Sequence, residues 1–194
     1  ILQAARGSDA LLFGPGLGNT PGTASLLEQL GESAGCPLVL DADGLNAAAA
    51  MESLPRPANL PLIITPHPGE MARLCGVTTA EINASRESVA VGYARANRCV
   101  VVLKGHRTIV AGPQGEVFCN TTGNPGLSRG GSGDILAGMT AAFLGQGLDP
   151  LYAAVCAVWL HGAAADRCAA RLGQYGMLPH DILYDLGTIF VNSG

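Results

Sequence analysis

The chain has 194 residues, of which 48% are hydrophobic and 13% are charged, and its formal net charge is −4. These values predict one domain, residues 1–194, with a sizeable core, and they argue against a disordered chain and against a surface that binds nucleic acid. No apolar run approaches the roughly 20 residues that span a bilayer, which argues against a membrane protein.

The cysteines and histidines show no metal-binding spacing. The six cysteines are Cys36, Cys75, Cys99, Cys119, Cys156 and Cys168. They form no C-x-x-C pair, and the histidines form no H-E-x-x-H motif. We therefore expect free thiols, a reducing, cytoplasmic compartment and no metal held by protein side chains alone, whereas Mg²⁺ brought in with a nucleotide stays open. His161 lies in an apolar helical run and is expected to be a hydrogen-bonded core residue.

Short apolar runs alternate with longer helical patterns along the chain. The patterns predict strands over 10–13, 37–40, 62–64, 99–103, 108–110 and 116–118, and helices over 21–34, 45–51, 69–75, 79–97, 131–146, 150–172 and 180–190. A Gly-Pro-Gln-Gly turn at 112–115 joins the last two strands in a hairpin. Repeated strand, loop and helix predict a parallel sheet flanked by helices, with ligands at the carboxyl ends of the strands.

A Gly-Pro-Gly-Leu-Gly turn follows the first expected strand. Gly14, Gly16 and Gly18 look like the start of a dinucleotide-binding fingerprint, but that motif requires Gly-x-Gly-x-x-Gly, and position 19 is Asn. Pro15 also removes one backbone N–H group. The sequence leaves two readings open, a turn that faces a ligand and a turn that is purely structural.

Two aspartates follow the second expected strand. Asp43 is expected to cap the helix that comes next, whereas Asp41, at the strand end itself, is the better candidate for a site. Neighbouring carboxylates at a strand end also suit Mg²⁺, so a metal-binding role for the pair stays open as well.

The third and fourth strands lead to His67 and Lys104. Prolines on both sides of His67 make its loop rigid, so the ring is read either as a ligand contact or as a surface or packing residue. Glu70 falls in the first turn of the next helix, where a carboxylate suits the helix dipole. Lys104 is read either as a cation that neutralises phosphate or as a solvated residue at a strand end.

The segment Asn124–Asp134 predicts the chemistry most directly. Gly130–Gly133, which is three glycines and a serine, precedes Asp134 and an Ala-rich apolar run, a pattern typical of a loop that feeds the N-terminus of a helix. Such a terminus has unpaired N–H groups and a partial positive charge, which favour phosphate. Asp134 is then interpreted as a base that takes a proton from a hydroxyl beside this anion site. The alternative is an acidic first turn that only suits the dipole.

Five motifs, taken in order, resemble the NAD(P)H-hydrate dehydratase family of the ribokinase-like superfamily. They are Gly-Pro-Gly-Leu-Gly at 14–18, Asp-Ala-Asp-Gly-Leu-Asn at 41–46, Thr-Pro-His-Pro-Gly-Glu at 65–70, Leu-Lys-Gly at 103–105, and Asn-Pro-Gly followed by Gly-Gly-Ser-Gly-Asp within 124–134. The resemblance covers nearly the whole chain. It implies an α/β fold, a ribokinase-like three-layer sandwich with a mostly parallel sheet flanked by helices, truncated at its N-terminus.

The resemblance implies a hydro-lyase that repairs NADH or NADPH hydrated at the nicotinamide ring. ADP or ATP, with Mg²⁺, phosphorylates the ring hydroxyl, and elimination of phosphate restores the cofactor. Asp134 matches the catalytic carboxylate and contacts the substrate, as do Gly16, Gly18 and His67. The nucleotide-binding positions are Lys104, Gly105, His106, Arg107, Thr108, Asn124, Gly126, Gly130, Gly131, Ser132 and Gly133. The resemblance also implies a homo-oligomer, which in the family is often a tetramer.

In the family a further segment usually precedes the first of these motifs, so we expect this sequence to be either a fragment or a shortened protein. We therefore expect the 194 residues alone to be marginally stable and weakly active, because sheet edge and core would be exposed. Two other functions stay open, a small-molecule kinase of the same superfamily and an inactive fragment that binds nucleotide without turnover. The intact Asp134 and Lys104 argue against the fragment, and the loop at 65–70 favours the dehydratase over the kinase.

Overall fold

The computed structural model describes residues 2–57 and 59–191, and its architecture is α/β. The strands are β1 (Leu11–Phe13), β2 (Leu38–Leu40), β3 (Leu62–Ile64), β4 (Val100–Leu103), β5 (Ile109–Ala111) and β6 (Val117–Cys119). They form one sheet in that order; β1 to β4 run parallel, and β5 and β6 each pair antiparallel with the strand before them. The predicted mostly parallel sheet with a terminal hairpin is confirmed.

Helices connect the parallel strands and cover the sheet. They are α1 (Leu2–Ala5), α2 (Pro21–Ser33), α3 (Asp43–Ala48), α4 (Pro68–Cys75), α5 (Thr79–Ala84), α6 (Arg86–Asn97), α7 (Ser132–Gly145), α8 (Pro150–Leu172) and α9 (Asp181–Val191). Each connection between parallel neighbours contains at least one helix, as such a crossover requires. Among the described residues, no helix has the length and apolarity to cross a membrane.

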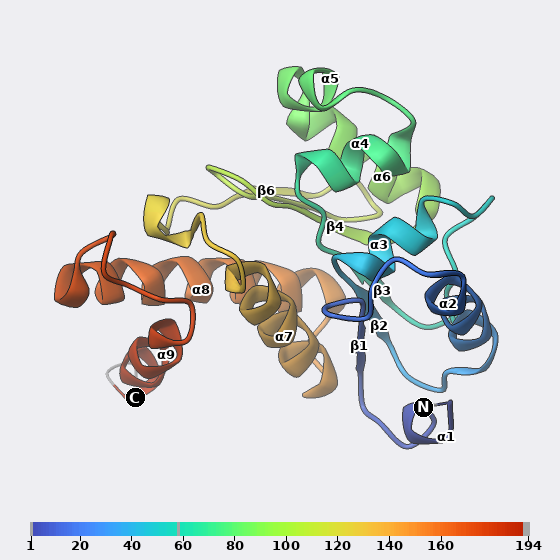
Figure 1. Ribbon diagram of the computed structural model, residues 1–194, viewed down its shortest axis with the longest axis horizontal. Helices are drawn as coiled ribbons and strands as arrows, with labels where there is room; N and C mark the ends of the chain where they lie inside the picture. Colours follow the sequence, from blue (N-terminus) through green and yellow to red (C-terminus); the bar gives the residue numbers. More distant parts are fainter. Residues whose placement is uncertain (1, 58, 192–194) are drawn as a thin grey trace.

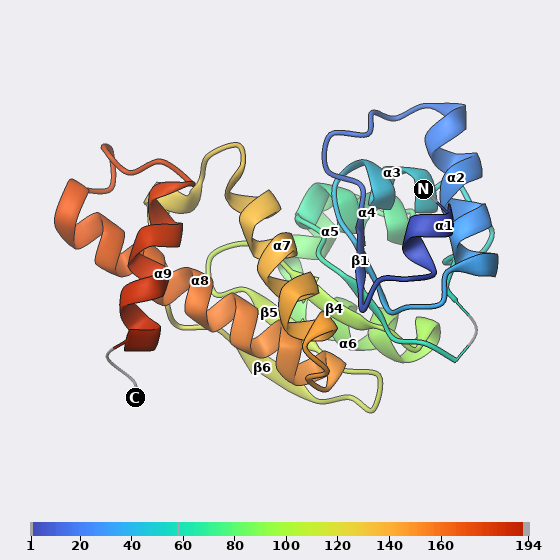
Figure 2. The same ribbon diagram turned by 90° about the horizontal axis from the view of Figure 1, so that it is seen from below.

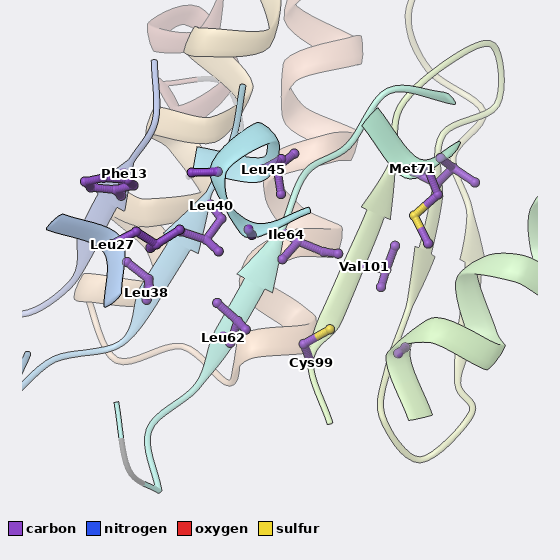
Figure 3. Packing of buried hydrophobic residues seen from close by; sticks show 14 of the residues in the cluster. Phe13, Leu27, Leu38, Leu40, Leu45, Leu62, Ile64, Met71, Cys99 and Val101 are labelled. Atoms are coloured by element: carbon purple, nitrogen blue, oxygen red, sulfur yellow. The ribbon is translucent and has the colours of Figure 1, made fainter. Parts of the chain in front are cut away.

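Both faces of the sheet are buried, which makes three layers. On β2, Leu38 and Leu40 belong to one core cluster and Val39 to another, and β3 and β4 alternate in the same way. The first cluster packs against α2 to α6 and the second against α7 and α8, so helices lie on the two sides of the sheet (Figures 1 and 2). Figure 3 shows residues of the first cluster, among them Phe13, Met71 and Val101. Burial on both faces explains why the strands read as continuous apolar runs.

Helix α9 packs on α8 and not on the sheet. Ile182 and Ile189 of α9 form a third core cluster with Ala164, Ala165 and Cys168 of α8. Figure 1 shows α9 on the far side of α8 from the helices of the first layer. The long helix α8 therefore covers the sheet with its first half and supports α9 and the loops near it with its second half.

The largest difference from the predicted elements lies between residues 79 and 97. The sequence predicts one helix, but α5 ends at Ala84 and α6 begins at Arg86, because Ser85 has a non-helical φ of −143° and ψ of 43°. This segment contains no Gly or Pro near the break, so local propensity gives no sign of it. The short helix α1 and a 3₁₀ turn over Pro125–Leu127 are also missing from the predicted elements.

Two glycines bring the turn at 14–18 against the start of α3. A Cβ on Gly14, whose φ is +134°, would overlap the carbonyl oxygen of Asp41, and a Cβ on Gly44 would lie 2.6 Å from the carbonyl oxygen of Phe13. Real Cβ atoms do not come so close to backbone oxygen, so this approach requires glycine at both positions. The packing joins the carboxyl ends of β1 and β2 at one edge of the sheet.

We expect Gly44→Ala to lower the free energy of unfolding by about 1–3 kcal/mol, because the added methyl group must push two backbone segments apart. Chemical denaturation at neutral pH measures the loss. Gly92→Ala is the matched control: Gly92 is an exposed residue inside α6, a Cβ there meets no atom within 4 Å, and the change should stabilise by roughly 0.5–1 kcal/mol. Equal effects of the two substitutions would contradict the close approach.

Candidate active site

Three charged side chains meet where β2, β3 and β4 end. Lys104 Nζ lies 2.7 Å from Asp41 Oδ1 and 3.8 Å from Glu70 Oε2. Asp41 is 1% exposed and Glu70 is 6% exposed, so both carboxylates are buried and need a partner. The lysine therefore lies at the carboxyl edge of the sheet, where two carboxylates hold it, and the reading of Lys104 as a solvated strand end is wrong.

The N-terminus of α7 faces this lysine. Gly131, with φ +94°, precedes the helix and no side chain caps it. A Cβ on Gly133 would lie 3.4 Å from Lys104 Nζ and 3.9 Å from Asp41 Oδ2, so this ion pair lies at van der Waals distance from the start of α7. Ser132 donates its backbone N–H to the Arg129 carbonyl, which leaves the N–H groups of Gly133 and Asp134 without a bond within the described part of the chain. Unbonded N–H groups beside a cation suit an anionic ligand.

A cavity of about 460 Å³ opens beside this helix end. The segment from Lys104 to Thr108 forms one wall, and Asn120 with much of the segment 122–128 forms another. The floor comes from α7 and α8: Ser132, Gly133 and Leu136 from the first, and Val158, His161 and Gly162 from the second. A cavity of this size that is lined by both polar and apolar residues is typical of a small-molecule site.

His161 and Ser132 lie in the floor with unsatisfied polar atoms. Neither His161 Nε2 nor Ser132 Oγ has a hydrogen-bond partner in the described part of the chain, although both atoms are buried. Burial lowers the pKa of His161 from its ordinary 6.5 to about 4, and a hydrogen bond with the Ser132 backbone opposes the fall. The ring is therefore neutral at neutral pH. The expected burial of His161 is confirmed, but the expectation that it is fully hydrogen-bonded is wrong for Nε2.

His67 lies at the start of α4 and caps it. Its Nδ1 accepts hydrogen bonds from the backbone N–H groups of Gly69 at 3.0 Å and Glu70 at 3.3 Å, and Glu70 Oε2 accepts one from the His67 N–H at 2.7 Å. This reciprocal pair is a capping box. The cap occupies Nδ1 and leaves half of the side chain exposed, so the predicted contact with a ligand stays a prediction.

Asp43 does not cap α3. The residue before the helix is Ala42 and makes no side-chain cap, whereas Asp43 Oδ2 accepts a hydrogen bond of 2.8 Å from the Gly18 N–H. The expected cap is therefore wrong, because the turn at 14–18 lies close enough to compete for the carboxylate. Gly16 and Gly18 both have positive φ, +74° and +77°, at the exposed end of this turn.

The loop that carries Lys104 depends on Arg86, which the sequence analysis does not single out. Arg86 donates from Nη1 to the His106 carbonyl at 2.7 Å and from Nη2 to the Leu103 carbonyl at 3.0 Å. Burial lowers the pKa of this guanidinium. Arg86 is the first residue of α6, where a cation opposes the helix dipole, so its position is a signal of a role outside the helix.

Asn124 lies on the opposite wall with its side chain engaged inside the protein. Its Nδ2 donates to the Ala165 carbonyl and to Asp166 Oδ1, and its Oδ1 accepts from the Gly126 N–H, each at 3.0 Å. A nucleotide contact from Asn124 would therefore come from its backbone. Gly126 is buried, and a Cβ there would overlap Met177.

The structure brings together most, but not all, of the predicted nucleotide-binding residues. Those that line the cavity are Lys104, Gly105, His106, Arg107, Thr108, Asn124, Ser132 and Gly133. Gly126, Gly130 and Gly131 lie in the loop behind them and outside the lining. Asp134 is exposed and directly follows Gly133 on α7, whereas Gly16, Gly18 and His67 lie at the ends of β1 and β3. These four predicted substrate residues share the carboxyl edge but not the cavity.

Known proteins resemble this chain in sequence over most of its length. A family profile described as NAD(P)H-hydrate dehydratase matches residues 1–187. The bifunctional NAD(P)H-hydrate repair enzyme Nnr of Moorella thermoacetica is 45% identical over 183 residues, and the ADP-dependent (S)-NAD(P)H-hydrate dehydratase of Neisseria meningitidis is 44% identical over 180 residues. The matches cover 94% and 90% of this chain but 34% and 60% of the two relatives, so the chain spans less than two thirds of either.

Solved structures resemble it as closely in fold. The ADP/ATP-dependent NAD(P)H-hydrate dehydratase from Bacillus subtilis, co-crystallised with ATP/Mg²⁺, has a TM-score of 0.87 at 34% identity and covers 98% of this chain and 69% of its own. A ribokinase-like superfamily protein from Enterococcus faecalis has a TM-score of 0.82 at 30% identity, with coverage of 98% and 66%. The predicted ribokinase-like α/β fold is confirmed.

The depressed pKa of His161 predicts acid sensitivity. Between pH 6.5 and pH 4 the unfolded chain binds a proton that the folded protein does not, so the free energy of unfolding falls as the pH falls through this window. The free energy of unfolding that His161 removes over this window is about 3 kcal/mol. We expect urea unfolding at pH 7, 5.5 and 4 to show this difference. Between pH 7 and pH 4 the free energy of unfolding of the wild type should fall by about 3 kcal/mol more than that of His161→Gln. His106→Gln, which removes an exposed ring, should keep the wild-type dependence on pH; a wild type that parallels His161→Gln would refute the assignment.

Proposed function

The chain belongs to the NAD(P)H-hydrate dehydratase family, and we propose that its site restores hydrated NADH or NADPH with an adenine nucleotide as second substrate. One observation carries the proposal. Lys104 Nζ lies 3.4 Å from the Cβ position of Gly133, and the next residue, Asp134, is an exposed carboxylate. A cation, helix N–H groups without a bond in the described part of the chain, and a carboxylate thus lie at the same helix end, as phosphoryl transfer to a hydroxyl requires.

The residues of the cavity fit a nucleotide. A volume of about 460 Å³ lies in the range of small-molecule sites. Lys104 and Arg107 supply cations to its lining, which also contains Ser132 and His161. Ser132 Oγ and His161 Nε2 are buried and have no hydrogen-bond partner among the described residues. Buried polar atoms without partners are rare in native proteins, and a polar ligand or water is a common reason for them.

Mg²⁺ fits this site only together with phosphate. The described residues include no group of three or more His, Cys, Asp or Glu side chains that could hold a metal ion. Asp41, the acidic residue beside Gly133, already has Lys104 as its partner. We therefore propose that the oxygens of the nucleotide phosphates supply most of the ligands of a bound Mg²⁺, as in other sites that hold this ion with phosphate.

In the proposed reaction, a side chain of α7 accepts a proton and the backbone of α7 stabilises negative charge. The nucleotide supplies a phosphoryl group that turns the ring hydroxyl into a good leaving group. Asp134 accepts the proton of that hydroxyl, and the N–H groups of Gly133 and Asp134 stabilise negative charge on the transferred group. Lys104 adds a positive charge that Asp41 and Glu70 keep in place. Loss of phosphate from one ring carbon and of a proton from the neighbouring carbon then restores the double bond of the reduced nicotinamide ring.

Several expectations from the resemblance remain predictions. They are the contacts of Gly16, Gly18 and His67 with the hydrated dinucleotide, the role of each nucleotide-binding residue, and assembly as a tetramer. A cytoplasmic location also remains a prediction; the six cysteines, all within the described part of the chain, are free thiols, which is consistent with it.

We expect Asp134→Asn to lower kcat by about 10²–10⁴, because the amide cannot accept the proton. The assay mixes hydrated NADH with ADP or ATP and follows both the absorbance of the reduced nicotinamide ring and the release of phosphate. Nucleotide affinity, measured by calorimetry, should change less than about threefold, since the carboxylate faces the hydroxyl and not the cavity.

Asp9→Asn is the matched control for this experiment. Asp9 is exposed and lies just before β1, at the amino end of the sheet, so its substitution should leave kcat unchanged. Recovery of the reduced ring by the wild type and the control, but not by Asp134→Asn, supports the proposal. A stable phosphorylated product would point to a kinase, and full activity of Asp134→Asn would rule out the proposed base.

A further inference from the structure

The loop that forms one wall of the cavity rests on the second half of α8. Thr122 Oγ1 donates to the Trp159 carbonyl at 2.9 Å. A Cβ on Gly162 would lie 2.7 Å from the carbonyl carbon of Thr122, so α8 and the loop touch backbone to backbone at this glycine. The small residue Gly162, next to His161, thus allows contact between α8 and the loop at Thr122.

One carboxylate on α8 binds two groups of this loop. Asp166 Oδ2 accepts the backbone N–H of Gly123 at 2.8 Å, and Asp166 Oδ1 accepts Asn124 Nδ2 at 3.0 Å. Both partners are donors, so the position requires a side chain with two acceptor oxygens. Within the described part of the chain, the Asp166 carboxylate makes no hydrogen bond to its own helix, and aspartate is a weak helix former, which indicates that its role lies in the loop.

The Asn124 side chain makes two further hydrogen bonds that extend this set along the loop. Its second amide hydrogen goes to the Ala165 carbonyl, and its Oδ1 accepts the Gly126 N–H at the start of the 3₁₀ turn. Asp166, Asn124 and the backbone of residues 123–126 therefore form a continuous set of hydrogen bonds, here called the loop clamp. Gly123 and Asn124 line the same cavity as Lys104 and Gly133, so the clamp fixes a wall that faces the phosphate end.

We propose that Asp166 is a positioning residue for the nucleotide, which acts through the loop clamp to hold the wall formed by Gly123 and Asn124 in its binding conformation. The inference rests on the proposed function, because it assumes that an adenine nucleotide occupies the cavity. Asp166 itself lies outside the cavity lining and does not touch the reacting atoms.

Asp166→Asn tests the clamp with an isosteric change. An amide keeps one acceptor, so either the Gly123 N–H or the Asn124 amide must face another N–H group. We expect the Kd of ADP and of ATP, measured by calorimetry, and the KM for the nucleotide to rise about tenfold. The KM for the hydrated cofactor and kcat should stay within about threefold of the wild type.

A second substitution distinguishes a direct interaction between residues 124 and 166 from two independent losses of nucleotide binding. Asn124→Asp alone brings two carboxylates together and should weaken nucleotide binding more than Asp166→Asn does. In the double variant Asn124→Asp with Asp166→Asn, the amide at 166 again meets an acceptor at 124, so nucleotide affinity should recover at least threefold relative to Asn124→Asp. Such recovery measures a direct interaction between the two positions.

Asp149→Ala is the control for helix stability. Asp149 caps α8 at its other end, where Oδ1 accepts the N–H of Leu151 at 2.9 Å, and it is remote from the cavity lining. This variant should melt at a lower temperature and still bind nucleotide as the wild type does.

The outcomes distinguish the clamp from the function on which it rests. A selective rise in the nucleotide Kd, with recovery in the double variant, supports the clamp. Wild-type affinity in a folded Asp166→Asn variant, or equal and additive losses in the double variant, would overturn the clamp and leave the proposed function intact. A wild-type protein that binds neither ADP nor ATP would overturn both.

Discussion

The ion pair between Lys104 and Asp41 joins two strand ends that are not neighbours in the sheet. Asp41 follows β2 and Lys104 follows β4, so the pair reaches over the end of β3. A carboxylate that is 1% exposed needs a counter-charge, because an unpaired charge in the core is very unfavourable. The requirement works in both directions: the cation satisfies the buried carboxylate, and the carboxylate keeps the cation at the edge where α7 begins.

Close backbone approach is the second constraint on the site. Gly44 lets α3 approach the end of β1, and Gly162 lets α8 approach Thr122. In both cases the partner is fixed, because it belongs to a strand end or to a hydrogen-bonded loop. A side chain at either of these positions would separate two parts of the carboxyl edge. The glycines therefore determine the spacing of the site, whereas the charged residues determine its chemistry.

Loops carry the ligand-facing groups, and helices remote in the sequence hold the loops. Arg86 of α6 binds the carbonyls of Leu103 and His106 on one wall of the cavity, and Asp166 of α8 binds the Gly123 N–H on the other. A guanidinium suits a set of carbonyls and a carboxylate suits a set of N–H groups, so each loop is held by the charge that matches its exposed backbone. Backbone groups held in this way do not have to be ordered when a ligand arrives.

The sequence by itself determined the strands, most helices, the mostly parallel sheet and the residue types of the anion site. These follow from apolar periodicity, from glycine patterns and from the rule that parallel strands end at one edge, all of which are local signals or depend only on strand direction. It also carried the motifs of the family at 14–18, 41–46, 65–70, 103–105 and 124–134.

Only the tertiary structure decided which of these residues meet and which side chains are already engaged. The Asp43 carboxylate binds the Gly18 N–H and does not cap a helix, and the side chains of Asn124 and Arg86 bond inside the protein. His161 Nε2 has no hydrogen-bond partner among the residues that the structure describes, and the helix expected over 79–97 breaks at Ser85. The physical reason is that a hydrogen bond or ion pair depends on positions within an ångström. Residues 17 to 41 positions apart reach such positions only through the packing of whole helices, which local sequence patterns do not encode.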